Sequence, residues 1–197
     1  MTPIILASTS PYRAELLGRL GLSFETVSPG VDETSFKASN GRELASALAR
    51  EKAQAVAQSN PGCIVIGSDQ VAVCDGRFLG KPGSTEAAIE QLLFQRGKAT
   101  LFETAVCVLD EQGVSNLECV LTLVQWLDTK QLTDELITNY VHREQPLDCA
   151  GAAKSEALGV TLISQMRSDD PTALVGLPLI ALTKLLRNAG IEPLSKP

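Results

Sequence analysis

Hydroxyl and guanidinium groups follow the first apolar segment of the chain, where a strand is expected to lead into a helix. Residues 4–7 read IILA, Ser8, Thr9 and Ser10 come next, and Arg13 lies in the first turn of a helical segment. A helix N-terminus offers unpaired N–H groups and a positive dipole end, and a guanidinium binds phosphate in a bidentate manner. The corner is a candidate anion site, although a capped helix with a solvated arginine is the simpler alternative.

Two charged residues stand where apolar side chains are expected. In the helical segment 42–59, Lys52 falls in the middle of the apolar arc. Asp69 follows the apolar run CIVIGS, and a buried carboxylate is unfavourable unless it is paired. Both indicate a site, with a snorkelling lysine and a turn-forming aspartate as the alternatives.

Further carboxylates and cations could complete a phosphate site. Asp32 and Glu33 lie in a polar loop and offer oxygen ligands for a hard metal such as Mg²⁺. Lys81 in LGKPG and Lys154 in AGAAKSE are additional cations, each of which reads alone as an ordinary loop residue. If these side chains converge, they fit metal-assisted attack of water on a phosphate, with a carboxylate such as Asp69 accepting the proton.

The elements that would position these residues alternate between strands and helices. We expect strands over residues 3–7, 22–28 and 63–76, the last interrupted at Ser68 and Asp69, and a hairpin of 100–110 with 117–127. We expect helices over residues 11–20, 42–59, 84–96, 133–144 and 178–188. For the first helix, Ser10 is the expected N-cap and Gly21 the expected stop. The pattern predicts a mixed α/β fold with a twisted, partly antiparallel sheet.

Composition limits the class of protein. The 197 residues, 44% hydrophobic and 20% charged, suit one soluble domain with room for two lobes. The net charge of −6 argues against a broad electrostatic grip on nucleic acid. We expect no membrane segment, because no uncharged apolar run approaches about 20 residues. We also expect no secretory signal, because the N-terminus lacks a basic segment followed by an apolar one.

Cysteine and histidine usage excludes several metal sites. The five cysteines are odd in number and scattered, without a CxxC pair, and they fit buried thiols in a reducing cytoplasm. They are Cys63, Cys74, Cys107, Cys119 and Cys149. A single histidine, His142, rules out a multi-histidine site.

Seven short motifs occur in a fixed order along nearly the whole chain. They are LASTSPYR, VDET, EKA, IGSDQV, GKP, CAGAAKSE and LVGLPLIAL. In this combination the chain resembles the Maf family of nucleotide pyrophosphatases. GSDQV, KSE and LVGLPLIAL resemble the subfamily that hydrolyses 7-methyl-GTP, whereas the dTTP/UTP members typically have DT in place of Asp69-Gln70.

The resemblance implies a fold and a reaction. The fold would be Maf/inosine-triphosphatase-like, a single domain over residues 1–197, with a mixed twisted sheet flanked by helices and an active-site cleft between two lobes. The reaction would split a nucleoside triphosphate between the α and β phosphates, with a divalent cation (Mg²⁺ or Mn²⁺), to clear modified nucleotides in the cytoplasm. A homodimer is also consistent with the resemblance.

The resemblance further implies a role for individual residues. Asp69 would activate water and, with Glu33, bind the metal. The triphosphate would be held by Ser8, Ser10, Arg13, Lys52 and Lys81. Base specificity would be set by Tyr12, Gln70 and Glu156. An aromatic face suits the cationic 7-methylguanine ring, and a carboxylate suits its N1–H and amino group.

The sequence departs from the subfamily around the base. Tyr12 stands where tryptophan is usual, Ala153 and Leu158 where aromatics are frequent, and Ala157 where glycine is frequent. These departures concern the base pocket and leave the catalytic set intact.

Three other functions are weighed against this reading. The same chemistry on dTTP and UTP is disfavoured by Gln70 and Glu156. A nucleotide-binding regulator of cell division without turnover would not need Asp69, and a cysteine hydrolase would need a base beside one of the thiols.

Overall fold

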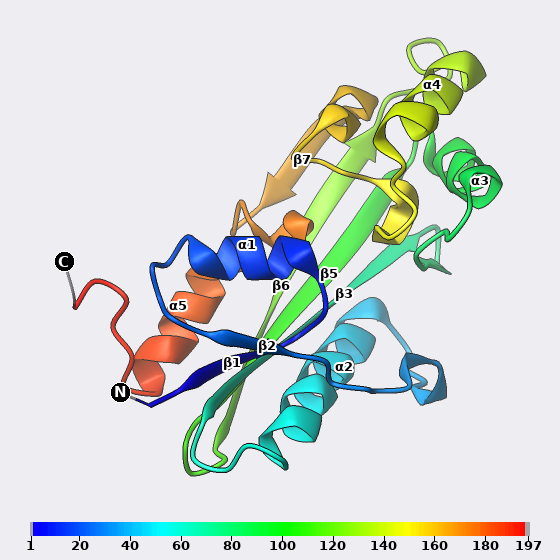
Figure 1. The fold of residues 1–197 in the computed structure, drawn as a ribbon. Coiled ribbons are helices and arrows are strands. Elements are labelled where there is room, and N and C mark those ends of the chain that lie inside the picture. Colours follow the sequence, from blue (N-terminus) through cyan, green and yellow to red (C-terminus); the bar gives the residue numbers. More distant parts are fainter. Residues whose placement is uncertain (1, 196–197) are drawn as a thin grey trace. The chain divides into compact units, whose positions relative to one another are not determined.

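The computed structural model describes residues 2–195 and has a seven-stranded mixed sheet with helices packed on it (Figure 1). The strand order is β2-β1-β3-β5-β6-β7, and β4 pairs with β3. The strands are β1 (Ile4–Ala7), β2 (Glu25–Val27), β3 (Ile64–Cys74), β4 (Arg77–Leu79), β5 (Ala99–Leu109), β6 (Ser115–Trp126) and β7 (Ile163–Ser168). Because β1 pairs parallel with β2 and β3, whereas β4 and β7 pair antiparallel, the predicted mixed α/β class is confirmed.

The helices follow the expected order along the chain. The α-helices are α1 (Pro11–Gly18), α2 (Gly41–Ala57), α3 (Thr85–Gln95), α4 (Asp134–Glu144) and α5 (Leu179–Asn188). Short 3₁₀ turns are η1 (Glu33–Ser35), η2 (Ala150–Ala152), η3 (Leu158–Leu162) and η4 (Ala173–Val175). Ser10 is the N-cap of α1 as predicted, because its Oγ accepts a hydrogen bond from the N–H of Arg13.

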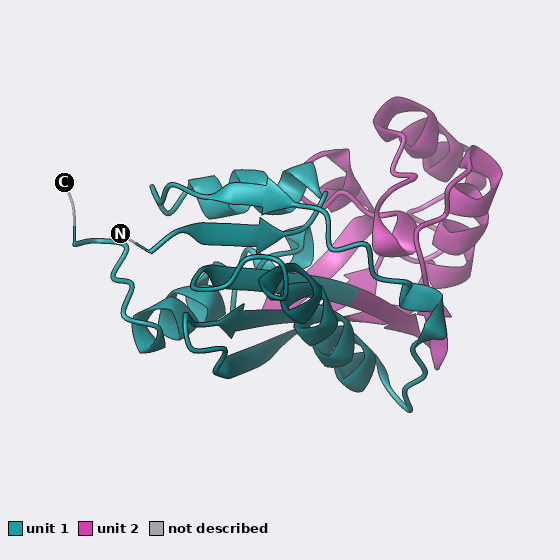
Figure 2. Cartoon of the chain, turned by 60° about the horizontal axis from the view of Figure 1, so that its bottom comes forward, with its two compact units in different colours: residues 1–70, 104–120, 170–197 teal, residues 71–103, 121–169 magenta. Residues whose placement is uncertain are grey.

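The chain forms two compact units, each built from separate stretches of sequence (Figure 2). Unit 1 comprises residues 1–70, 104–120 and 170–197, and unit 2 comprises 71–103 and 121–169. Strands β3, β5 and β6 each contribute residues to both units. A single domain over residues 1–197 and a cleft between two lobes stay predictions.

The expected interruption of the third strand is wrong. Strand β3 runs without a break from Ile64 to Cys74, through both Ser68 and Asp69. The polar side chains do not disturb the strand because each is satisfied: the Oγ of Ser68 donates to the carbonyl of Ala105 at 2.8 Å, and Asp69 is paired with a lysine. Strands β4 and β7 were not expected, and four of the six β7 residues are exposed, so that no apolar alternation marks that strand.

Alternation along the strands of unit 1 divides its core between two faces. Ile4, Leu6, Ile64 and Ile66 point to one face, where they pack with leucines of α1 and α5. The full cluster adds Leu16, Leu17, Val106, Val108, Leu177, Leu182, Leu185 and Leu186. The intervening positions, Val65, Gly67 and Asp69, therefore face the other side of the strand, which α2 covers.

Gly67 permits close contact between β3 and α2. A Cβ at this position would lie 2.2 Å from the carbonyl oxygen of Ala49 and 2.7 Å from the backbone N of Ala53. Because both atoms are helix backbone, α2 would have to move, and Gly67→Ala should lower the free energy of unfolding by about 3 kcal/mol. Urea denaturation measures the loss. Gly18→Ala is the matched control, since a Cβ there meets nothing within 4 Å. Equal stability of both variants would show that α2 does not rest on β3.

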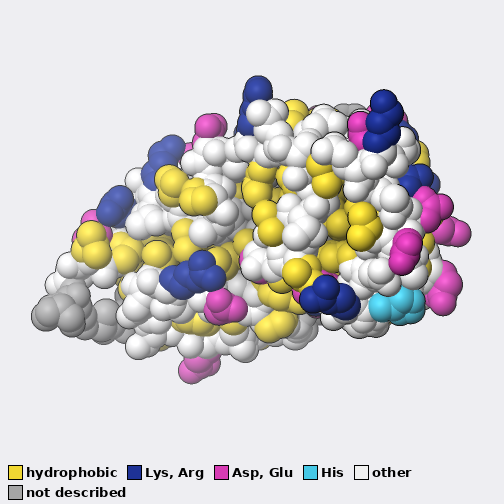
Figure 3. Space-filling view, turned by 90° about the horizontal axis from the view of Figure 1, so that it is seen from above, with side chains coloured by type: hydrophobic (Ala, Val, Ile, Leu, Met, Phe, Trp, Pro, Cys, Tyr) yellow, Lys and Arg dark blue, Asp and Glu magenta, His cyan; other side chains and the backbone are white. Residues whose placement is uncertain are grey.

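Charged side chains of both signs lie on one face of the molecule (Figure 3). On the face shown in Figure 3, Lys and Arg side chains are scattered among acidic and uncharged ones. Within residues 2–195, no helix is long and apolar enough to cross a membrane. Only Cys74 and Cys107 of the five cysteines are buried, so the expectation of buried thiols holds for two of the five.

Candidate active site

A lysine and two carboxylates form a compact cluster in unit 1. The Nζ of Lys52 lies 2.6 Å from Oδ1 of Asp69 and 2.6 Å from Oε1 of Glu33. Helix α2 supplies Lys52, strand β3 supplies Asp69, and the 3₁₀ turn η1 supplies Glu33. The carboxylate of Asp32 caps the N-terminus of η1. Lys52 and Asp69 are each only 6% exposed, whereas the side chain of Glu33 is half exposed. The periodicity of α2 therefore places Lys52 inward as predicted, with an ion pair as the reason.

Burial and charge act in opposite directions on this cluster. Burial raises the pKa of Asp69, and the charges of Lys52 and Arg13 oppose that rise. Burial likewise lowers the pKa of Arg13, opposed by the charges of Asp69 and Glu33. An arginine stays protonated in proteins, so Arg13 remains a cation despite its burial. The cations Arg13 and Lys52 therefore interact electrostatically with the carboxylate of Asp69. A carboxylate whose pKa is raised by burial is suited to accept a proton.

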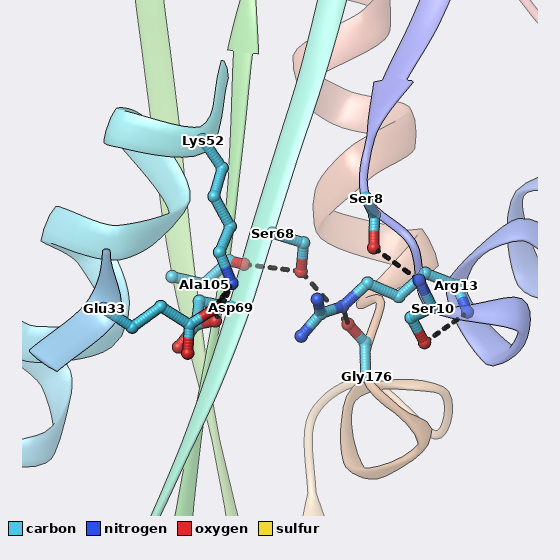
Figure 4. Close-up of polar contacts among 9 residues, drawn as sticks. All are labelled: Ser8, Ser10, Arg13, Glu33, Lys52, Ser68, Asp69, Ala105 and Gly176. Atoms are coloured by element: carbon cyan, nitrogen blue, oxygen red, sulfur yellow. Dashed lines mark hydrogen bonds and ion pairs between the residues drawn. The ribbon is translucent and has the colours of Figure 1, made fainter. Parts of the chain in front are cut away.

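Arg13 reaches the same strand from the opposite side. Figure 4 shows Lys52 and Glu33 meeting Asp69 on one side of β3 and Arg13 extending toward the strand from the other. The Nε of Arg13 donates to the carbonyl of Gly176 at 2.8 Å. This hydrogen bond fixes the position of the Arg13 side chain, whereas a freely solvated arginine would have no such bond.

The predicted anion corner is ordered by its own hydroxyls. The Oγ of Ser8, which is buried, accepts from the N–H of Ser10 at 3.1 Å. The Oγ of Ser10 accepts from the N–H of Arg13 at 3.4 Å, so both serines hold the strand-to-helix turn in place. The backbone of Ser8, Ser10 and Arg13 thus forms one ordered corner, and phosphate binding there stays a prediction.

A buried aspartate that the sequence reading did not single out shapes the segment that holds Arg13. Asp170 is 2% exposed, and its Oδ2 accepts from the N–H groups of Ile180 and Ala181 at the start of α5. Its Oδ1 accepts from the N–H and hydroxyl of Thr172. These bonds hold the segment of residues 170–181 in a loop, and the carbonyl of Gly176 in that loop accepts hydrogen bonds from Arg13 and Ser68. No local sequence signal marked Asp170, because it lies outside the first turn of α5, to which the dipole preference for acidic residues is confined.

The side-chain amide of Gln70 donates hydrogen bonds to the segment of residues 170–181 as well. Its Nε2 donates to the carbonyls of Ala173 and Leu174 and to the hydroxyl of Thr104, all within 3.0 Å. Tyr12 lies in the first turn of α1 and is partly buried. Their roles in base specificity stay predictions.

The remaining predicted residues belong to unit 2. Lys81 is exposed in the segment between β4 and α3, and Glu156 is exposed in a turn before η3. Convergence of Lys81 and Glu156 with the unit 1 residues stays a prediction. The ammonium of Lys154 donates to the carbonyl of Glu144, the last residue of α4, which is a capping contact.

The donor set fits a magnesium ion that keeps water and substrate ligands. Glu33 and Asp69 present carboxylate oxygens to one point, the ammonium of Lys52, and both belong to unit 1. Mg²⁺ is usually bound through one or two carboxylates plus phosphates and waters, rather than in a cage made only of protein ligands. Residues 2–195 contain no group of three or more His, Cys, Asp or Glu side chains suited to a metal.

The chain is similar to known proteins over nearly its whole length. A family model described as "Maf-like protein" matches residues 3–189. A 7-methyl-GTP pyrophosphatase of Cupriavidus pinatubonensis is 51% identical over 188 residues, which cover 95% of this chain and 93% of that protein. A 7-methyl-GTP pyrophosphatase of Aromatoleum aromaticum is 51% identical over 189 residues, covering 95% and 96%.

A solved structure is also similar in part. The nucleoside-triphosphatase (dITP/XTP pyrophosphatase) of Mycobacterium abscessus has a TM-score of 0.43 and 19% identity, covering 64% of this chain and 73% of that one. The family model spans almost all of the sequence, including every segment that supplies the Lys52–Asp69–Glu33 cluster and the Arg13 corner. The chain belongs to the Maf-like protein family.

Proposed function

We propose that the protein hydrolyses 7-methyl-GTP to 7-methyl-GMP and pyrophosphate. The observation that carries the proposal is the buried ion pair of Lys52 with Asp69, joined by Glu33, in a family whose similar members are named 7-methyl-GTP pyrophosphatases. A buried charge is costly unless an opposite charge or hydrogen bonds compensate it. Here the cluster combines a carboxylate base with cations suited to phosphate.

Each residue of the cluster has one proposed task. Asp69 accepts the proton of the attacking water, for which burial prepares it by raising its pKa. Lys52 and Arg13 offset the negative charge that develops on the phosphates. Ser8 and Ser10, which order the turn before α1, hold the phosphate beside the helix N-terminus.

A divalent cation completes the proposed site. Glu33 and Asp69 would hold Mg²⁺ or Mn²⁺, which when bound polarises the phosphate and offsets its charge. Lys52 contacts both carboxylates, so its ammonium keeps their oxygens together before a metal binds.

Three residues would select the base. We propose that Tyr12 stacks on the cationic 7-methylguanine ring. Glu156 would accept hydrogen bonds from the N1–H and amino group of guanine. Gln70 would act through its amide oxygen, since its N–H₂ group already donates to Thr104, Ala173 and Leu174. Lys81 would add a further cation for the triphosphate.

Product identity tests the reaction type. The protein is incubated with 7-methyl-GTP and Mg²⁺, and products are separated by anion-exchange chromatography. We expect 7-methyl-GMP and pyrophosphate in equal amounts. Formation of 7-methyl-GDP and phosphate would contradict cleavage between the α and β phosphates, and binding without products would favour a non-catalytic regulator. We place the activity in the cytoplasm, with a homodimer as the proposed assembly, on the family resemblance.

A further inference from the structure

The segment of residues 150–159, called here the recognition segment, contains a tight turn closed by hydrogen bonds to the carbonyl of Lys154. Glu156 lies in a turn closed by the N–H of Ala157, which donates to the carbonyl of Lys154 at 3.1 Å. The N–H of Gly159 donates to the same oxygen at 3.0 Å. A Cβ at Gly159 would lie 2.4 Å from that oxygen, so the backbone approaches Lys154 as closely as only glycine allows. The position of Lys154 therefore determines where Glu156 is presented.

Helix α4 anchors Lys154 through a buried tyrosine. The Oη of Tyr140 accepts from the N–H of Lys154 at 3.0 Å and is 3.3 Å from the carbonyl of Ala152, to which it donates. Tyr140 is 4% exposed, and burial raises the pKa of its phenol, which therefore stays protonated and able to donate. The Nζ of Lys154 adds a bond to the carbonyl of Glu144 at 2.8 Å. Lys154 is thus held at its N–H, its carbonyl and its ammonium.

Helix α3 anchors the start of the recognition segment through a second buried group. The Nε2 of Gln95 donates to the carbonyl of Gly151 at 2.8 Å. Its Oε1 accepts from the hydroxyl of Thr100 at 3.0 Å, and that hydroxyl accepts from the indole N–H of Trp126 at 2.8 Å. Gln95 and Thr100 are fully buried. Since Trp126 can only donate, this chain of bonds fixes the direction in which the Gln95 amide points.

We propose that Tyr140 and Gln95 are positioning residues for base selection, holding the recognition segment so that Glu156 meets the base. The proposal rests on the proposed function of this site. Neither residue would touch the nucleotide. All the contacts that carry it lie within unit 2.

Loss of these anchors should affect selectivity more than turnover. A displaced Glu156 would lose hydrogen bonds that the base makes equally in the bound substrate and in the transition state, so KM rises while kcat changes little. Nucleotides that do not use Glu156 would lose nothing. The ratio of kcat/KM for 7-methyl-GTP to that for UTP should fall about tenfold.

The experiment compares Tyr140→Phe and Gln95→Met with the wild type. Tyr140→Phe keeps the buried ring and removes only the hydroxyl, so it is the variant expected to keep the fold. Arg96→Met is the matched control, because Arg96 bonds to the carbonyl of Leu132 and to Asp134, at the opposite end of α4. For each protein, kcat and KM are measured with 7-methyl-GTP, GTP and UTP, and folding is monitored by thermal denaturation.

A lower selectivity ratio in Tyr140→Phe and Gln95→Met, with the ratio retained in Arg96→Met, supports the proposal. A loss of activity that is equal for all nucleotides overturns it, because a merely structural role lowers the amount of active enzyme without changing the ratio. If the wild type prefers a base other than 7-methylguanine, the proposed substrate is wrong, and the positioning role is then judged on the ratio for that base. A wild type without turnover overturns both.

Discussion

Asp69→Asn is expected to lower kcat for 7-methyl-GTP about 10³-fold while nucleotide binding is retained. The side chain is buried on β3, with its Oδ1 2.6 Å from the ammonium of Lys52. Asparagine has the same shape and can still accept a hydrogen bond from Lys52, but it cannot take a proton from water. Removing one negative charge also leaves Lys52 and Arg13 free to attract the triphosphate. Steady-state kinetics gives the loss of kcat, and isothermal titration calorimetry gives the affinity.

Asp110→Asn is the matched control for this substitution. Asp110 lies in the hairpin turn between β5 and β6, where its Oδ1 accepts from the N–H groups of Gln112 and Val114, and an amide oxygen can replace it. This variant should keep wild-type kcat. A rate for Asp69→Asn within a few-fold of the wild type would remove Asp69 from the role of base.

Lys52→Met is expected to lower the free energy of unfolding by about 3–5 kcal/mol at pH 7. The ammonium is the ion-pair partner of both Asp69 and Glu33, and its loss leaves the Asp69 carboxylate buried without that partner. Glu33 is half exposed and can be solvated, so most of the cost falls on Asp69. Urea denaturation in the presence of EDTA measures this loss without a contribution from metal.

The pH dependence of this variant follows from the sign of the Asp69 shift. Burial raises the pKa of Asp69 in the folded protein, and removal of Lys52 takes away an opposing charge. A carboxyl group with a raised folded-state pKa favours folding below its unfolded pKa, about 4, and that contribution is lost as pH rises through the folded value. The stability gap between Lys52→Met and the wild type should therefore narrow as the pH is lowered.

Lys184→Met supplies the comparison for Lys52→Met. Lys184 pairs with Glu118 at 2.5 Å, but its side chain is 67% exposed, and an exposed pair contributes less than about 1 kcal/mol. Similar losses for the two lysine variants would show that the Lys52 pair behaves as an ordinary surface ion pair.

Local sequence signals predicted the parts of the site that depend on local structure. Helical periodicity placed Lys52 on the buried face of α2, and the order of Ser10 and Pro11 marked the start of α1. In both cases the determining interactions lie within one or two helical turns. Residue type and position also marked Asp69 and Glu33 as candidate carboxylates, but helical periodicity could not pair them with Lys52.

Interactions between distant segments could not be predicted in the same way. Arg13 donates to a carbonyl 163 residues away, at Gly176, and a backbone acceptor leaves no signature in residue type. The continuity of β3 at Ser68 and Asp69 was missed for the same reason, since the partners that satisfy these side chains come from β5, α2 and the segment before α5. A sequence pattern predicts a strand break at polar residues because it does not show the tertiary partners that allow the strand to continue.

The most direct test of the proposed function is pyrophosphate release from 7-methyl-GTP, GTP, dTTP, UTP and CTP, measured with Mg²⁺ for the wild type and Asp69→Asn. We expect the highest kcat/KM for 7-methyl-GTP, and loss of turnover for every nucleotide in the variant. Preferred turnover of dTTP and UTP would retain the chemistry of Asp69 and contradict the roles of Tyr12, Gln70 and Glu156. Absence of turnover with all five nucleotides would contradict the enzymatic function itself.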